Sequence, residues 1–239
     1  MIESITHMIG TLINVAAILV GSLVGISVGS RLSENLRNTV IHGLGLVTSL
    51  IGLQMALQTQ NVLVLLAAML CGGVVGEVLR INEGIDKLGY FLQSKLSKGQ
   101  ASKFSEAFIT ASLVFCVGPM AILGSIQDGL SGDYSLLTVK SMLDGFASIA
   151  FSASLGWGVS FSAVSILLYQ GSITLFAGMF DKILTKPMIV EMTATGGLII
   201  VGLGLKLLNL KEIRLANFLP ALAIAPLIVM LIPIVKSFL

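Results

Sequence analysis

Eight apolar stretches, each close to the length of a membrane-spanning helix, constrain the fold of this chain more than any other feature. A helix needs about 20 residues to cross the hydrocarbon core of a bilayer. With 11% of its residues charged and a mean hydropathy of +0.99, the chain lacks the polar surface of a soluble protein. We therefore expect an all-α polytopic membrane protein that forms a single transmembrane domain over 1–239. The predicted spans are 9–28, 39–57, 62–79, 104–118, 136–155, 159–180, 189–208 and 215–235.

The fourth stretch carries a helix break at Gly118 and Pro119. A proline inside a helix removes a backbone donor and clashes with the preceding turn. The residues that follow, AILGSIQDGLSGDYS, are small and polar. They could form a half-helix, a re-entrant loop or an exit into solvent. The chain crosses eight times if the fourth stretch spans the bilayer, which we favour, and seven times if it is re-entrant.

The two ends of the chain resemble each other at an offset of about 150 residues, so that 9–80 aligns with 159–239. Gly52-Leu53 then falls on Gly202-Leu203, and both parts read as a span, a basic loop, a glycine-rich span, a turn and a third span. With eight crossings the repeats are inverted, an architecture frequent among transporters. With seven crossings they would be parallel.

Between the repeats, residues 81–103 place apolar side chains at helical spacing opposite acidic and basic ones. This pattern predicts an amphipathic helix in the membrane interface. Basic residues cluster after the first and third spans, which predicts an external N-terminus and a cytoplasmic amphipathic helix. Lys182 and Lys186 conflict with that orientation. In the first span, Gly21, Gly25 and Gly29 recur every four residues and predict close helix packing.

The central segment, 104–158, holds a charged pair inside a predicted span. Asp144 lies near the middle of its span, where a carboxylate costs about 2.5–3.5 kcal/mol on insertion scales. Lys140 precedes it by one turn on the same helix face. Charged groups in spans usually line pathways, so Asp144 could couple a proton or cation. The alternative is a structural buried pair.

Further polar residues are candidates for contact with a solute or an ion. Gln127 and Asp128 follow the helix break by about two turns and could act together with broken-helix carbonyls near Gly118, or could belong to a solvated turn. Asn14 and Gln170 lie within the first and sixth spans, and the alternative for Asn14 is a hydrogen bond to a neighbouring helix. Glu77 and Arg80 share one helix face, which predicts an interfacial ion pair or, as the sharper alternative, a gate.

Several classes of function find no support in the sequence. A net charge of +2 gives no reason to expect nucleic-acid binding. Cys71 and Cys116 lie in apolar runs without a histidine cluster, so no metal site is predicted. The chain carries no phosphate-binding glycine motif and no Ser/His/Asp or Cys/His set, so we expect neither a cofactor nor an enzyme.

Several runs carry a resemblance to a known family. These are GTLIN at 10–14, GEVLR at 76–80, and, in the centre, FCVGPMAILGSIQDGLSGD, KSMLDGFASIAFSASLGWGV and YQGSIT. Together they resemble the YqgA/YdfK-like family of bacterial inner-membrane proteins. The resemblance implies a multi-pass plasma-membrane protein of seven or so spans. It adds little on activity, because the family is a domain of unknown function described only as membrane or transport proteins.

Charge and helix breakage between two similar triplets of spans favour a secondary transporter or channel-like carrier of a small polar or ionic solute. The alternative is a non-transporting membrane scaffold or sensor that acts through helix–helix contacts. The expected partners are the lipid bilayer and a small solute or ion. The glycine-rich faces also suit a homo-oligomer.

Overall fold

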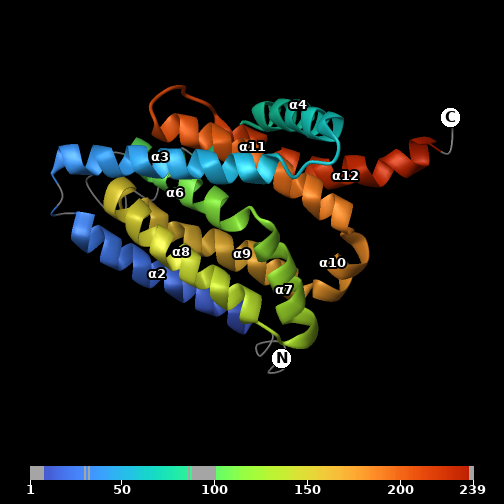
Figure 1. Cartoon of the computed structure of the whole chain (residues 1–239), viewed down its shortest axis with the longest axis horizontal. Helices are drawn as coiled ribbons and strands as arrows, with labels where there is room; N and C mark the ends of the chain where they lie inside the picture. The colour runs from blue at the N-terminus through green and yellow to red at the C-terminus, as the bar shows by residue number, and fades with distance from the viewer. Residues whose placement is uncertain (1–7, 30, 32, 86, 88–100, 237–239) are drawn as a thin grey trace. The chain divides into compact units, whose positions relative to one another are not determined.

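The computed structural model describes residues 8–29, 31, 33–85, 87 and 101–236, and every regular element among them is a helix (Figure 1). The chain forms two compact units, one made of 1–44 and 88–183 and the other of 45–87 and 184–239. The predicted amphipathic helix at 81–103 falls largely outside the described residues. The repeat boundaries drawn from the sequence stay predictions.

The first unit contains most of the polar central segment. It includes the N-terminal part of α3 (Glu34–Ala56), which continues into the second unit. Its other elements are α2 (Ile9–Gly29), α6 (Ala101–Cys116), α7 (Pro119–Ser131), α8 (Ser135–Leu155), the short 3₁₀ helix η1 (Trp157–Phe161), α9 (Ser162–Leu175) and α10 (Ala177–Ile183).

The second unit contains the remainder of α3 and the last helices of the chain. Its other elements are α4 (Val62–Val78), α11 (Lys186–Leu207), the 3₁₀ helix η2 (Leu215–Phe218) and α12 (Leu219–Lys236). Among the described residues, six helices are long and apolar enough to span a membrane, and a bent pair would make seven. The predicted all-helical membrane fold is confirmed at this level. α4 is apolar but shorter, with 17 residues.

The predicted helix break is confirmed between α6 and α7, which meet at an angle of 61°. Gly118 has a φ of +153°, a conformation that glycine adopts without steric cost. Pro119 is the first residue of α7, where its missing N–H leaves no helical hydrogen bond unmade. Gly132 then ends α7 in the left-handed conformation, with a φ of +71°. The backbone preferences of the local residues therefore determine where the helix breaks.

In the first unit, α2 and α8 run parallel and touch along their lengths (Figure 1). Gly21 faces the backbone of Gly145, and eight residues later Gly29 faces Ala153. Because the residue numbers of both helices increase in the same direction along the contact, α2 and α8 are parallel. The absence of a side chain at Gly21 and Gly29 lets the backbones approach closely, as the four-residue spacing predicts.

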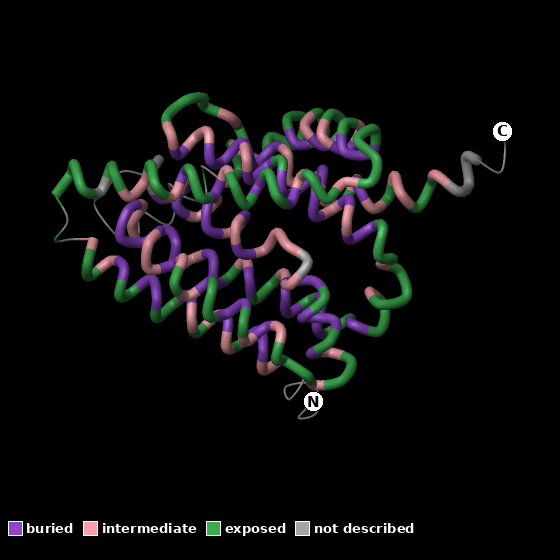
Figure 2. Tube along the Cα trace, in the orientation of Figure 1, coloured by how far each residue is buried: buried purple, intermediate pink, exposed green. Residues whose placement is uncertain are grey.

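α9 returns antiparallel to α2 after the turn at Gly156, so that Gln170 meets Asn14 and Gly171 lies near Met8. Both helices contain buried residues (Figure 2), among them Asn14 of α2 and Gln170 of α9. At the end of α6, Phe115 is fully buried and lies edge-on against Phe151, with ring centroids 6.1 Å apart.

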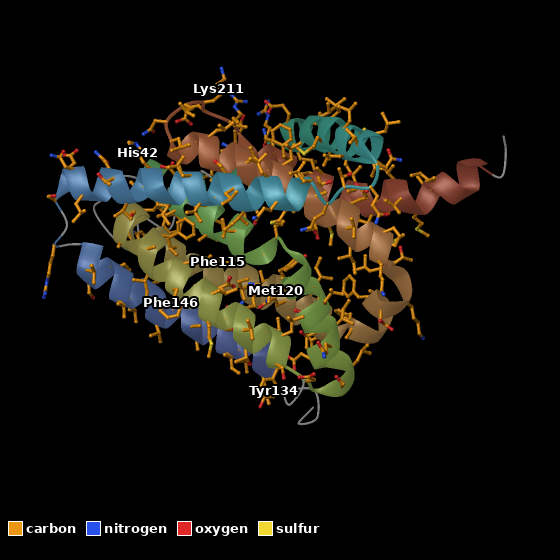
Figure 3. The ribbon with its side chains drawn as sticks, in the orientation of Figure 1. His42, Phe115, Met120, Tyr134, Phe146 and Lys211 are labelled. Carbon is orange, nitrogen blue, oxygen red and sulfur yellow. The ribbon has the colours of Figure 1, made fainter. Side chains whose placement is uncertain are left out.

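α8 also has an exposed side with large apolar side chains. Phe146 is one of them, as expected for a surface that meets lipid (Figure 3).

In the second unit, the predicted counterpart helices also run antiparallel. A Cβ at Gly52 would lie 2.7 Å from the carbonyl oxygen of Gly197, and Gly45 packs against Leu208, so α3 and α11 have opposite directions. Similarly, Gly72 of α4 packs against Ala221 of α12, and the next turn of α4 packs against the residues just before α12. Small residues again set the approach of each pair.

A buried carboxylate fixes the start of α4. Glu191 of α11 accepts hydrogen bonds from the Gln60 and Asn61 backbone N–H groups, at 2.7 and 3.0 Å, and from the Thr59 hydroxyl at 2.7 Å. Asn61 is itself the N-cap of α4. These bonds satisfy backbone donors that lie ahead of the first helical turn, and the negative charge suits the positive end of the helix.

Candidate functional site

The predicted charged pair lies on the buried face of α8. Lys140 and Asp144 are 6% and 7% exposed, and the Lys140 ammonium forms an ion pair with Asp144 Oδ2 across one helical turn. Ser141 and Ser148 are buried on the same side of the helix. These four residues form a polar stripe on α8 that is turned into the first unit and away from its surface.

Two amide side chains from other helices join this pair. Asn14 Nδ2 of α2 donates to Asp144 Oδ2 at 3.0 Å and to Gln170 Oε1 of α9 at 3.1 Å. Asn14 and Gln170 are completely buried. We call these four residues, Lys140, Asp144, Asn14 and Gln170, the polar cluster. It joins α2, α8 and α9, and Asn14 and Gln170 are 156 residues apart in the chain.

The polar cluster keeps hydrogen-bonding capacity that the described protein groups do not use. Asn14 Oδ1 and Gln170 Nε2 have no hydrogen-bond partner among the described residues. A buried polar atom without a partner costs about 1–3 kcal/mol. The cluster therefore presents one unpartnered acceptor and one unpartnered donor beside an ion pair whose two charges neutralise each other.

Asp128 and Gln127 are adjacent in sequence but have different surroundings. Asp128 is completely buried in α7, and its Oδ2 accepts a hydrogen bond from the Gly10 N–H of α2 at 3.1 Å. Gln127 is exposed and donates to Asp133 Oδ2, at 2.8 Å, in the turn after α7. The structure therefore places Asp128 near the first turn of α2 and leaves Gln127 outside the polar cluster.

The predicted ion pair between Glu77 and Arg80 requires a correction. Glu77 pairs with Arg214 at 2.8 Å and accepts a hydrogen bond from Asn217 Nδ2 at 2.6 Å. α4 ends at Val78, and Arg80 adopts a left-handed conformation with a φ of +52°, so the two residues no longer share a helix face. The helical spacing used in the prediction does not extend past the helix end.

Sequence reasoning missed two buried hydroxyls on the helices that carry the amides of the polar cluster. Thr11 precedes Asn14 by three residues on α2, and Thr174 follows Gln170 by four on α9. Both hydroxyls are buried. Their helical spacing from the two amides was the available signal, because residues three or four apart share a helix face. Within the described residues, no group of three or more His, Cys, Asp or Glu side chains could hold a metal ion.

Comparison with known proteins identifies relatives across almost the whole chain. A family model described as "Protein of unknown function (DUF554)" matches residues 9–230. The "Uncharacterized membrane protein YdfK" of Bacillus subtilis (strain 168) is 29% identical over 229 residues, which cover 94% of this chain and 97% of that protein. The "Uncharacterized protein YqgA" of Escherichia coli (strain K12) is 29% identical over 221 residues, which cover 91% and 94%. No solved structure is significantly similar to the chain.

Proposed function

This multi-pass membrane protein belongs to the DUF554 family, and on that premise we propose that it is a secondary transporter or channel-like carrier of a small polar or ionic solute. We place it in the bacterial inner membrane. The observation that carries the proposal is the polar cluster. Buried charged and amide groups in a membrane are costly, and they usually mark pathways for ions or solutes.

The chemistry of the polar cluster limits the solute. Lys140 and Asp144 neutralise each other, and Asn14 Oδ1 and Gln170 Nε2 supply one free acceptor and one free donor. A solute with both hydrogen-bonding functions satisfies these atoms and removes their burial cost. The few polar groups recognise only a small molecule, since recognition of a large polar ligand needs many more contacts.

The break between α6 and α7 supports the same proposal. Irregular backbone at membrane depth is tolerated where it lines a cavity or is buried in protein, and transporters build their sites from such broken helices. α7 begins at this break, and its residue Asp128 accepts a hydrogen bond from the first turn of α2. The next turn of α2 carries Asn14. The broken element and the polar cluster therefore share α2 as a common support.

We further propose eight crossings and an inverted repeat. Six long helices, the bent pair α6–α7 and α4 make eight, and the 17 residues of α4 rise about 26 Å, near the lower limit for a span. The predicted counterparts α2 and α9, α3 and α11, and α4 and α12 each run antiparallel. Opposite direction of each pair is what an inverted repeat requires.

Solute flux into liposomes tests the proposal directly. Purified protein would be reconstituted, and uptake of labelled amino acids, organic acids and inorganic ions would be measured against empty liposomes. We expect saturable uptake of one class by the wild type. Asp144→Asn and Gln170→Leu should reduce this uptake at least about tenfold, equivalent to the loss of roughly 1.4 kcal/mol of binding.

A matched variant separates loss of the site from loss of the fold. Thr193→Val removes a buried hydroxyl on α11, in the other unit, and should leave uptake unchanged. Wild-type liposomes without saturable flux of any class would contradict the proposal and favour the scaffold or sensor alternative. Full uptake by Asp144→Asn would remove that residue from the mechanism.

A further inference from the structure

A second group of buried polar side chains lies one helical turn from the polar cluster. Asn14 of α2 touches Gln170 of α9, and the two helices are antiparallel. One turn back along α2 is Thr11, and one turn forward along α9 is Thr174. Because the helices run in opposite directions, these two steps lead to the same level of the first unit.

α7 brings its polar residues to this level. The Asp128 carboxylate accepts a hydrogen bond from the N–H of Gly10, the residue before Thr11. Its neighbour Gly129 packs directly against the carbonyl oxygen of Thr174. Ser125 precedes Asp128 by three residues and shares its helix face. The last turns of α7 and α9 therefore meet the first turn of α2, and all three helices carry buried oxygen-bearing side chains at this level.

The three hydroxyls of this group have no partner among the described residues. Thr11 and Ser125 are 0% exposed and Thr174 is 3% exposed, yet Thr11 Oγ1, Ser125 Oγ and Thr174 Oγ1 make no hydrogen bond there. In spans, hydroxyls commonly bond a carbonyl of their own helix, and Ser141 does so in α8. We propose that Thr11, Ser125, Asp128 and Thr174 form a binding site for a monovalent cation of the Na⁺ type.

Charge and ligand type favour a cation of single charge. Hydroxyl, carboxylate and carbonyl oxygens are hard ligands that suit alkali and alkaline-earth ions. The group holds a single carboxylate, that of Asp128, so a divalent ion would remain under-compensated in a low-dielectric site. Asp128 and Thr174 also lie in the last turns of α7 and α9, whose C-terminal ends carry partial negative charge. An anion would meet repulsion from both helix ends and from the carboxylate.

The cation site deepens the proposed function and rests on it only for the role of the ion. In a secondary transporter, a cation one turn from the solute would couple its gradient to solute movement through α2 and α9, which contribute residues to both sites. Cation binding itself requires no transport, so the two proposals can fail separately.

Thermal unfolding of the purified full chain in detergent tests the site. Unfolding midpoints would be compared in NaCl, LiCl, KCl and choline chloride at equal ionic strength, without solute. We expect a saturable rise in Na⁺ relative to choline, because a ligand that binds only the folded state stabilises it. Thr174→Val and Ser125→Ala should each raise the Na⁺ concentration at half-saturation about tenfold or more.

These two variants keep the test free of folding artefacts. Their hydroxyls have no protein partner in the described residues, so their removal should leave the midpoint in choline chloride unchanged or slightly raised. Thr193→Val, which removes an equally buried and unpartnered hydroxyl of α11, should keep the wild-type response to Na⁺.

Two results would overturn the site: equal midpoints in Na⁺ and choline, or wild-type Na⁺ half-saturation in both Thr174→Val and Ser125→Ala. A Na⁺ response without any solute flux would sink the transport proposal and leave the cation site standing. Solute flux without a Na⁺ response would overturn the cation site and leave the transport proposal standing.

Discussion

Gly21 of α2 lies directly against the backbone carbonyl of Gly145 in α8, and a Cβ at Gly21 would overlap that oxygen. Backbone packs on backbone here, so neither partner can move aside by a change of rotamer. The polar cluster depends on this approach, because Asn14 of α2 and Asp144 of α8 are joined by a hydrogen bond of 3.0 Å. Helix packing thereby sets the geometry of the site.

Gly21→Val should therefore destabilise the first unit. Overpacking of a tight interface typically costs about 1–3 kcal/mol, and the rigid neighbour favours the upper end. Thermal unfolding in detergent measures the effect. Gly43→Ala is the matched control, because a Cβ at Gly43 meets nothing within 4 Å and alanine is the better helix former. Equal midpoints for Gly21→Val and wild type would show that the interface can open without cost.

The Lys140–Asp144 pair allows structure and function to be separated. Lys140→Met leaves the Asp144 carboxylate buried without its cation, and such a change costs about 3–5 kcal/mol. Replacement of both by apolar residues, Lys140→Met with Asp144→Leu, should recover most of that loss, since no buried charge remains.

Thermal midpoints of the single and double variants, with solute flux in parallel, provide the measurement. We expect the double variant to be folded and inactive. A double variant that transports like wild type would assign the pair a structural role alone.

Glu191 should contribute to stability through the start of α4. Its carboxylate accepts two backbone N–H bonds and one hydroxyl bond, and hydrogen bonds to charged groups are worth about 1.5–3 kcal/mol. Glu191→Ala should lower the unfolding midpoint and speed proteolysis near Thr59. Glu212→Ala is the control, because that carboxylate is 86% exposed and its ion pair is long at 3.7 Å. Similar midpoints for the two variants would contradict the capping role.

Asp133, in the turn between α7 and α8, should give a small dependence of stability on acid pH. Hydrogen bonds from Ser135 and then from Gln127 hold the pKa of Asp133 below its ordinary value. A depressed pKa means that the folded state binds fewer protons, so the contribution is present above the unfolded pKa and is lost as pH falls through the folded one.

Midpoints of wild type and Asp133→Asn measured from neutral to acid pH should therefore converge as the pH falls. The effect is small, because the group is exposed to solvent. A difference that stayed constant down to the most acid pH would contradict the assignment.

Local sequence determined much of this protein. Span length predicts the helices, since burial of backbone polar groups in lipid leaves few alternatives to helix. Gly118 and Pro119 determine the break between α6 and α7 through their own backbone preferences. Helical periodicity alone places Lys140 and Asp144 one turn apart on a shared face, and the structure pairs them.

Only the tertiary structure decided which distant side chains meet. Asn14 and Gln170 are 156 residues apart, and nothing in their local sequence relates them until α2 and α9 pack antiparallel. For the same reason, Glu77 finds Arg214 across 137 residues instead of Arg80 beside it in the chain. Helical spacing acts over one turn, whereas contacts between helices depend on their direction, register and closeness. In this protein those are set by the small residues at which helix backbones touch.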